Sequence, residues 1–508
     1  MPQGTLPFKY EAENTRTGMT SLAGLPTYLE LAHVAGLRKS VEKHLGVRRG
    51  TQGWTDAQVV TALVMLNMAG GEHVDDLRIL EADEGFCRLL RRIEHHELPR
   101  QQFRLLERRW RKERQRSLPS PSAVFRYLSA FHDPAQEALR MDGKAFIPAP
   151  NAHLAGMPRV NGDLLCFLQA NRKCRRATLD MDATLTETMK SSALFCYKGY
   201  ASYQPLNTWW AEQEVIVHTE FRDGNVPAGY EQLRVLKEAL ACLPEGVEEV
   251  RLRSDTAGYQ HELLRYCAKG TNERFGRIEF AVGSDVSKEF KKAVAEVAEE
   301  DWRPLYKDID GQRVKTETQW AEVCFVPNGM GYSKNSPVYR YLAKRSLLRE
   351  QMSLPGIDSI AKDLPFPTIS LGGKRYKVFG IVTNLDWEGE RLIHWHHERC
   401  GKSEEAHAIM KKDLAGGKLP SEDFGENAAW WWMMILALNL NNIMKRLVLG
   451  KQWQAKRMKA IRFWLVNLPG RVVEHARMLL VKLSGRHPSF DLLLEMRQKI
   501  LMLKPVPV

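Results

Sequence analysis

The spacing of hydrophobic residues changes along the chain and divides it into three parts. From about residue 25 to residue 131, apolar positions recur every three or four residues, which is the period of an amphipathic helix. Between about residues 161 and 286, short alternating runs typical of strands stand between helical stretches. After residue 401 the helical period returns and continues nearly to the end. The pattern predicts an α/β core between helical N-terminal and C-terminal regions.

Several elements of this pattern have clear boundaries. The segment 54–71 predicts a helix with Thr55 as its N-cap and Gly70 with Gly71 as its end. In the α/β part, strands are predicted at residues 176–184, 210–221, 248–255 and 277–285, and helices at residues 228–243 and 257–270. Two further predicted strands, at residues 320–327 and 375–385, indicate a β-rich unit inserted into the core.

Composition and charge narrow the class of partner. The chain has 508 residues, of which 44% are hydrophobic, enough for two to four packed domains at roughly 100–200 residues each. Its formal net charge of +13 favours an anionic partner, of which nucleic acid is the commonest. The charge by itself leaves ribosomal, membrane-surface and nuclease classes open.

The cysteines and the apolar stretches argue against a secreted, a zinc-binding or a membrane-spanning protein. The 8 cysteines are spread along the chain without a C-x-x-C pair or a histidine cluster, so we expect reduced thiols in a cytosolic protein and no zinc site. The N-terminal residues lack the apolar core of a secretory signal. The most apolar stretch, residues 428–440, falls short of the roughly 18 uninterrupted apolar residues of a membrane span, so we expect a buried helix.

A basic segment in the N-terminal part has two interpretations. Residues 98–116 interleave cations, among them Arg104, Arg108 and Arg111, with Phe103 and Trp110 at helical spacing. The segment is either a solvated helix face or a helix that contacts DNA, because phosphate contacts need many cations on one side. The cationic stretch after residue 451 leaves the same two alternatives open.

Three acidic positions each accompany a structural signal. Asp182 closes a predicted strand and is followed by Thr184, Asp255 closes another strand before a turn into a helix, and Glu404 lies early in a helix. Carboxylates at strand ends and on a facing helix can converge at one edge of a sheet. Cleavage of a phosphodiester by two Mg²⁺ ions uses such oxygen ligands, with the ions about 4 Å apart.

The sequence around these acids resembles the DDE transposases of bacterial insertion sequences, most closely the group conventionally numbered 1380. The segments "LDMDAT", "RSDTAGY" and "HHERCGKSEEAHAIMKKDLAGGKLPSEDF" are similar to the three active-site blocks of that family, and the similarity extends over most of the chain. The resemblance implies an RNase H-like mixed sheet with flanking helices, a β-rich insertion between the second and third acids, and helical N-terminal and C-terminal regions.

The resemblance assigns the acids residue by residue. Asp182 and Asp255 match the first and second acids, and Asp180, on the same strand face as Asp182, either assists a metal or is a structural neighbour. Glu404 matches the third acid, with Glu405 as the alternate.

The surroundings of the third acid match the family only in part. Arg399 matches the family's arginine, but four residues separate it from Glu404 where the family has three, and His396 stands where the family has tyrosine. Lys411 matches the family's lysine and, with Arg399, is expected to contact DNA phosphate.

The same resemblance divides the chain into five expected regions. They are a helical N-terminal DNA-binding region (1–150), the first part of the catalytic core (151–288), the β-rich insertion (289–386), the second part of the core with the third acid (387–450) and a basic helical C-terminal region (451–508).

The function implied is a transposase that binds terminal inverted repeats and cuts and rejoins DNA. Two Mg²⁺ ions, which Mn²⁺ can replace, would be held by the three acids. The partners implied are the transposon ends and target DNA, with a homodimer in the synaptic complex, no membrane, and a location in the bacterial cytoplasm at the nucleoid. The alternative is a catalytically inactive, transposase-derived DNA-binding protein. Within the insertion, Trp302 and Trp320 are expected to stack on an unpaired base.

Overall fold

The chain forms two compact units in the computed structural model. The structure describes residues 11–12, 15, 17–48, 53–96, 98–104, 116–327, 337, 339–348, 364, 366–476 and 478–506. Unit 1 comprises Met1–Asp133, Pro150–Phe167 and Ile409–Val508, and unit 2 comprises Pro134–Ala149 and Leu168–Ala408.

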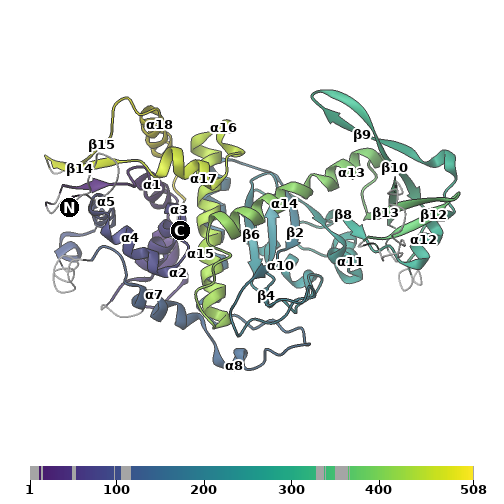
Figure 1. The fold of residues 1–508 in the computed structure, drawn as a ribbon, viewed down its shortest axis with the longest axis horizontal. Helices are drawn as coiled ribbons and strands as arrows, with labels where there is room; N and C mark the ends of the chain where they lie inside the picture. The colour runs from purple at the N-terminus through teal and green to yellow at the C-terminus, as the bar shows by residue number, and fades with distance from the viewer. Residues whose placement is uncertain are drawn as a thin grey trace, which may run out of the picture. The chain divides into compact units, whose positions relative to one another are not determined.

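Unit 2 is built on one large mixed sheet (Figure 1). Its strands are β2 (Arg176–Ala183), β5 (Leu206–Trp210), β6 (Val215–Glu220), β7 (Glu249–Ser254), β8 (Glu279–Ser284), β9 (Arg303–Ile309), β10 (Gln312–Val323), β11 (Arg340–Leu347), β12 (Thr368–Leu371) and β13 (Lys374–Thr383). The order is β6-β5-β2-β7-β8-β13-β11-β10-β9, with β12 paired to β13. A separate pair consists of β3 (Thr186–Glu187) and β4 (Ser202–Tyr203).

The first five strands of this order have RNase H-like topology. β5 is antiparallel to β2 and to β6, whereas β7 is parallel to β2 and β8 is parallel to β7. Helices α10 (Gln232–Cys242) and α11 (His261–Lys269) make the crossovers that these parallel connections require. The mixed α/β fold expected from the sequence is confirmed.

The remaining helices of unit 2 are α8 (Pro134–Glu137), α12 (Lys288–Ala295), α13 (Gly389–His397) and α14 (Arg399–Ala408). The sheet of the insertion continues that of the core, because β13 pairs antiparallel with β8 over Thr383↔Ala281 to Gly380↔Ser284. The β-rich insertion therefore shares one backbone hydrogen-bond network with the strands that carry the first two acids. The region boundaries given above stay a prediction.

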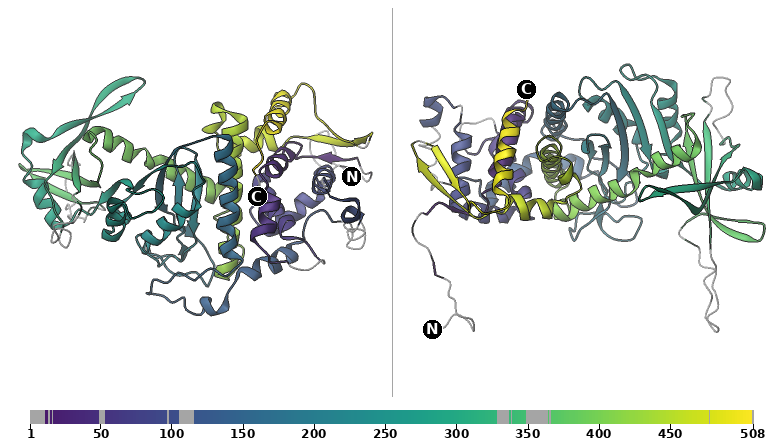
Figure 2. Two further views of the ribbon diagram at one scale, coloured as in Figure 1. Left: turned by 180° about the vertical axis from the view of Figure 1, so that it is seen from behind. Right: turned by 90° about the horizontal axis from the view of Figure 1, so that it is seen from above.

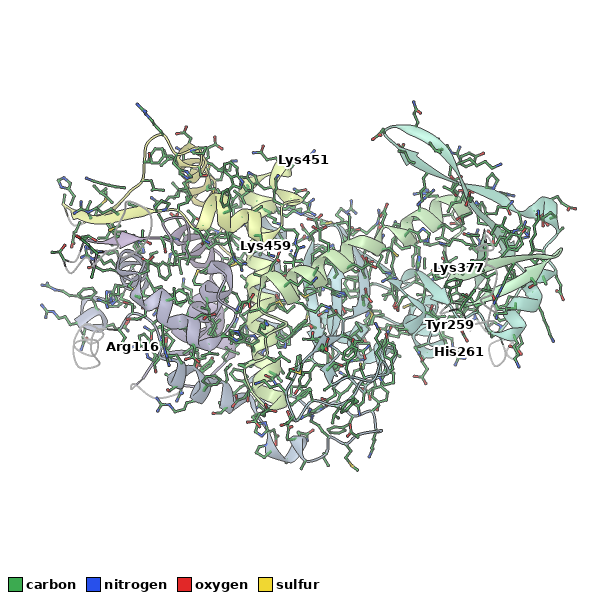
Figure 3. The ribbon with its side chains drawn as sticks, in the orientation of Figure 1. Arg116, Tyr259, His261, Lys377, Lys451 and Lys459 are labelled. Atoms are coloured by element: carbon green, nitrogen blue, oxygen red, sulfur yellow. The ribbon has the colours of Figure 1, made fainter. Side chains whose placement is uncertain are left out.

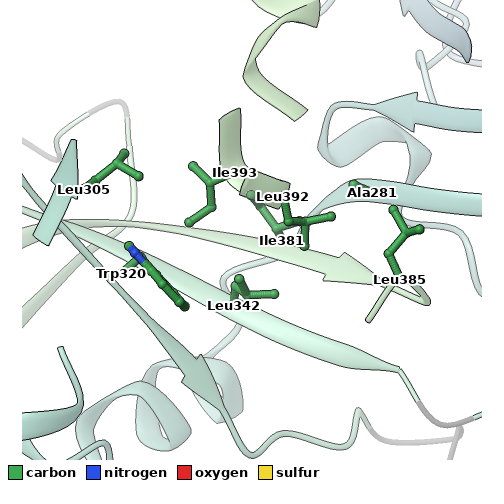
Figure 4. Close-up of a cluster of buried hydrophobic side chains, with 8 residues drawn as sticks. All are labelled: Ala281, Leu305, Trp320, Leu342, Ile381, Leu385, Leu392 and Ile393. Carbon is green, nitrogen blue, oxygen red and sulfur yellow. The ribbon is translucent and has the colours of Figure 1, made fainter. Parts of the chain in front are cut away.

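Helix α13 lies on one face of this continuous sheet (Figure 2). A buried hydrophobic cluster fills the space between them, as Figure 4 shows; its members are Ala281, Leu305, Trp320, Leu342, Ile381, Leu385, Leu392 and Ile393. Helix and sheet are in close contact at Gly389, where an added Cβ would lie 2.1 Å from the Trp320 ring. Glycine is required here because any side chain would push the start of α13 off the sheet.

Unit 1 is mainly helical. Its helices are α1 (Pro26–Val34), α2 (Leu37–His44), α3 (Asp56–Ala69), α4 (Leu77–Ala82), α5 (Glu84–Glu94), α7 (Pro121–Leu128), α15 (Phe424–Ile443), α16 (Lys451–Gln454), α17 (Met458–Ile461) and α18 (Phe490–Leu501). Helix α9 (Met157–Asn171) runs from this unit into unit 2. The predicted bounds of α3 are confirmed, with a capping box between Thr55 and Gln58 and a left-handed C-cap at Gly70.

The long apolar stretch forms a buried helix, as predicted. Every residue of α15 is buried, and Asn439 donates a hydrogen bond to Oδ1 of Asn161 at 2.7 Å. Among the described residues, no helix is long and apolar enough to cross a bilayer.

Two predicted elements were wrong in detail. The single strand expected at residues 210–221 is the second half of a hairpin, because residues 211–214 turn between β5 and β6. The helical C-terminal region contains a hairpin of β14 (Gly470–His475) and β15 (Met478–Lys482). β14 also pairs with β1 (Met19–Thr20), a strand about 450 residues earlier that a local period cannot reveal.

Truncating the cluster beneath α13 should destabilise unit 2. Leu392 is fully buried, so Leu392→Ala should lower the free energy of unfolding by about 2–5 kcal/mol through lost burial and an unfilled cavity. Denaturant unfolding followed by tryptophan fluorescence measures the loss. Leu347→Ala is the control, since Leu347 is 43% exposed and its truncation should change stability by less than about 0.5 kcal/mol. Equal effects of the two substitutions would contradict the packing described.

Candidate active site

The first two acids meet at the ends of neighbouring parallel strands. In the pairing of β2 with β7, Asp180 lies opposite Arg253, and Met181 lies opposite Ser254. Asp182 and Asp255 follow at the next level, and side chains alternate along a strand, so both lie on the face that carries the first pair. The convergence expected from the sequence is therefore present for these two residues.

The carboxyl group of Asp182 lies in an environment that disfavours its charged form. The side chain of Asp182 is 20% exposed, and burial raises its pKa to about 7, with the negative charges of Asp255 and Asp180 adding to the rise. The guanidinium of Arg399 acts in the opposite direction. Asp255 also accepts a hydrogen bond from the backbone N–H of Ala257 at 3.0 Å, which holds its side chain at the strand end. The site concentrates negative charge where water is partly excluded.

Asp180 lies deeper and has a different partner. It forms a bidentate ion pair with Arg253, with Nε at 2.6 Å from Oδ1 and Nη2 at 2.8 Å from Oδ2, and both side chains are 1% exposed. Since each carboxylate oxygen accepts from the guanidinium, the geometry favours the structural alternative for Asp180. It joins β2 to β7 directly below the acid pair.

Arg253 also holds the C-terminal end of α13. Its Nη1 donates to the carbonyl oxygen of Trp395 at 2.6 Å and lies 3.2 Å from Oε2 of Glu398, while the guanidinium stacks over the Trp395 ring. Nε2 of His396 contacts the carbonyl oxygen of Ser254 at 3.0 Å. A carbonyl only accepts, so this nitrogen carries the proton, and burial lowers the pKa of His396 to about 3. The histidine in the family's tyrosine position is thus a neutral packing residue.

Arg399 is placed beside the first acid. Its Nη1 lies 3.3 Å from Oδ2 of Asp182, and its side chain is 10% exposed. Sequence comparison predicted a contact with DNA phosphate for this residue, and that role stays a prediction.

The extra residue between Arg399 and Glu404 lies in a break of the helix. Cys400 and Gly401 have non-helical backbone angles, with φ of 84° at Gly401, and helical geometry resumes after them. A left-handed angle suits glycine because it has no Cβ. The departure from family spacing therefore coincides with a kink in the backbone.

The helix after the kink distinguishes Glu404 from Glu405, although both are exposed. His407 turns toward the sheet, where its Nε2 lies 3.5 Å from Nδ2 of Asn207, and Asn207 pairs with Asp182 across β5 and β2. Residues three apart on a helix are neighbours and residues two apart are not. Glu404 thus lies on the side of the helix next to His407, and Glu405 lies on the opposite side.

Lys411 lies beyond the α-helical part. The segment Ile409–Asp413 is a π-helical turn, which belongs to unit 1, whereas α14 belongs to unit 2. Lys411 therefore lies outside the α-helix that carries Glu404, and its contact with DNA phosphate stays a prediction.

The described residues fit a divalent cation in part. Asp182 and Asp255 offer only oxygen ligands, the kind that Mg²⁺ prefers, and their charges are crowded. No group of three or more His, Cys, Asp or Glu side chains within the described ranges is arranged to hold a metal ion. Two of the three expected ligands are thus together, and the role of Glu404 stays a prediction.

The other residues predicted to contact DNA differ in their exposure to solvent. Arg104 is exposed, whereas Arg108 and Arg111 lie outside the described residues. The expectation that Trp302 and Trp320 stack on a base was wrong for this structure, because they are 5% and 3% exposed and packed under Arg345 and Arg303.

Sequence reasoning missed Arg253, although a signal for it exists. Arg253 stands two residues before Asp255, as Asp180 stands two residues before Asp182. A cation and an anion at equivalent positions of two predicted strands indicate a cross-strand pair. Asn207 and His407 carry no comparable signal, since β5 itself was not predicted.

Comparison with protein families gives a match along most of this architecture. The family model described as transposase DDE domain group 1 matches residues 9–325 and 369–505, which include Asp182, Asp255 and Glu404. The chain belongs to this family. The match is to the family as a whole, so the assignment to insertion-sequence group 1380 stays a prediction. No curated protein is similar to the chain in sequence.

Among solved structures, the chain is similar to one described as the cryo-EM structure of piggyBac transposase synaptic complex with hairpin DNA. The TM-score is 0.44 and the identity 11%, and the match covers 86% of this chain and 79% of that one. The topology described above rests on the strand pairing of this chain alone.

The raised pKa of Asp182 predicts a pH-dependent stability. A carboxyl group with a raised pKa binds more protons in the folded state than in the unfolded chain, so stability should fall as pH rises from about 4 to 7. Above pH 7 the folded protein carries a partly buried, ionised carboxylate at Asp182, and Asp182→Asn removes that charge. The substitution should raise the free energy of unfolding above pH 7 by on the order of 1–3 kcal/mol, and by less near pH 5. Unfolding in EDTA at pH 5 and pH 8 measures both, and a pH-independent effect would contradict the assignment.

Breaking the buried ion pair should be more damaging. Arg253→Met leaves Asp180 buried without its partner and releases the end of α13, so the free energy of unfolding should fall by about 3–5 kcal/mol. The double variant Asp180→Leu with Arg253→Met should recover part of the loss, since no buried charge is left unpaired. If Arg253→Met unfolds like the wild type, the pair does not hold the strands together.

Proposed function

We propose that this protein is a transposase that binds the terminal inverted repeats of an insertion sequence and catalyses metal-dependent cleavage and strand transfer of DNA. The observation that carries the proposal is the Asp182–Asp255 pair at the ends of parallel strands in an RNase H-like sheet. It occurs in a chain that belongs to a DDE transposase family.

The residues of the site have complementary tasks in this proposal. Asp182, Asp255 and Glu404 would hold the cations. Two Mg²⁺ ions supply charge for the attacking and leaving oxygens of the scissile phosphate, and Mn²⁺ can replace them. Arg399, 3.3 Å from Asp182, places a permanent cation beside the phosphate position. In this proposal water and then the DNA 3′-hydroxyl are the nucleophiles, so no side chain bonds covalently to DNA.

DNA as the partner is supported by family and charge. A formal net charge of +13 attracts a polyanion, and phosphate contacts dominate the affinity of most DNA-binding proteins. In the proposal both transposon ends and target DNA are bound, two copies of the chain act together on paired ends, and the work takes place at the bacterial nucleoid.

Cleavage of a labelled duplex tests the proposal and the residues together. The duplex carries the terminal repeat of the element that encodes the chain. With Mg²⁺, Asp182→Asn, Asp255→Asn and Glu404→Gln should each cut at least about 10²–10³-fold more slowly, since each weakens the binding of cations that compensate transition-state charge. Glu405→Gln is the matched control, one residue away on the other side of the helix, and should cut at the wild-type rate.

Binding of the same duplex, measured in EDTA, separates catalysis from recognition. The four variants should bind as the wild type does. If Glu405→Gln abolishes cutting and Glu404→Gln does not, Glu405 is the third acid. A wild type that binds the repeat and cuts with neither Mg²⁺ nor Mn²⁺ would sink the catalytic proposal in favour of an inactive DNA-binding relative.

A further inference from the structure

The sheet face that carries the acid pair also carries lysines from three strands of the insertion. Lys344 on β11 lies two residues from Leu342, Lys377 on β13 lies two residues from Phe379, and Lys307 on β9 lies two residues after Leu305. Leu342 and Leu305 belong to the cluster beneath α13 (Figure 4), and Phe379 is packed against that cluster. Because side chains alternate along a strand, the lysines project on this same face. Lys377 is labelled in Figure 3.

Helix α13 adds a histidine to these lysines. Nζ of Lys344 forms a hydrogen bond with Nε2 of His397, so this ring nitrogen is the acceptor. We call Lys307, Lys344, Lys377 and His397 the cation cluster. No ion pair joins its three lysines to a carboxylate within the described ranges.

The lysines lie near aromatic rings and one another instead: Nζ of Lys344 is 4.9 Å from the centroid of the Phe379 ring, and Nζ of Lys377 is 4.6 Å from that of Phe366. Burial lowers the pKa of Lys344 to about 8. The thiol of Cys400 acts in the opposite direction, and the charges of Lys377 and Lys307 add to the lowering. Burial likewise lowers the pKa of His397 to about 4, with Lys344 the first of the charges that add to this. Cations held together at this cost are stabilised when an anion binds among them.

The end of α13 connects the cluster to the acids. Three residues within one helical turn reach three different strands: His397 contacts Lys344 on β11, His396 contacts Ser254 on β7, and Arg399 contacts Asp182 on β2. An anion on the cluster would thus lie on the same side of the sheet as the acids, at the other side of this helix end.

We propose that the cation cluster is a phosphate-binding site that holds the DNA strand running from the acid pair across the insertion. The proposal rests on the function proposed above. Lysines act as point charges toward phosphate and carry no base-specific pattern, so the contact is independent of sequence. Lys307 and Lys377 are exposed and come from different strands of the sheet, so a phosphate backbone that crosses these strands would contact both.

The matched control lies on the same strand. Lys374 is exposed on β13, three residues from Lys377, and so projects on the opposite face. Lys307→Met with Lys377→Met removes two exposed charges of the cluster without disturbing the core, and Lys374→Met removes one charge from the other face.

Fluorescence anisotropy in EDTA measures binding without cutting, on a duplex with the terminal repeat and flanking DNA, from about 50 to 200 mM NaCl. The double variant should bind about tenfold more weakly at 100 mM, and the slope of log K against log[salt] should fall by about one to two. Lys374→Met should match the wild type. If the double variant has the wild-type affinity and slope, the cluster is not a phosphate site.

Two further variants guard against misfolding and against confusion with the first proposal. Lys344→Met removes a buried charge, so its thermal stability should equal or exceed that of the wild type while its DNA binding weakens. Lys344→Arg should restore binding, and equal weakening by Met and Arg would overturn the proposal. If the wild type does not bind the duplex at all, the proposed function is refuted. If the wild type binds and cuts DNA, and the substitutions in the cation cluster leave binding unchanged, only this inference is refuted.

Discussion

The buried ion pair between Asp180 and Arg253 is the interaction on which the site depends. It crosses from β2 to β7, lies directly below the acid pair, and uses the remaining guanidinium donors on Trp395 and Glu398 at the end of α13. Burying two charges is costly, so such a pair persists only where its geometry satisfies both partners. Arg253 thus contacts both strands and the end of α13, the helix that precedes Arg399.

Helix α13 packs against strands of both the core and the insertion and so connects them. At its first residue Gly389 lies against Trp320 of β10, in its middle Leu392 and Ile393 fill the cluster, and at its end His396 contacts β7. Because β13 pairs directly with β8, the sheet beneath is continuous. A strand of DNA bound along this face would contact the insertion and the acids without crossing a hinge between them.

The electrostatics of this face follow from the same packing. Negative charge gathers at Asp182 and Asp255, positive charge gathers at the cation cluster, and the end of α13 stands between them with Arg399 on the acid side. In the proposed complex, divalent cations would neutralise the carboxylates, and neighbouring phosphates of the bound DNA strand would neutralise the lysines.

Local pattern determined much of this protein: the α/β core, the bounds of α3, the ends of β2 and β7 and the acids on them follow from residue type and period. Tertiary pairing decided the rest. The partner of Asp180 is Arg253, 73 residues away, and the side of α14 that faces β5 is marked by the contact of His407 with Asn207, 200 residues away. The burial of Trp302 and Trp320, the continuity of the sheet and the pairing of β14 with β1 also rest on distant partners. A period reports which side of an element is apolar, whereas the partner of a side chain is set by strand register, which only the folded chain contains.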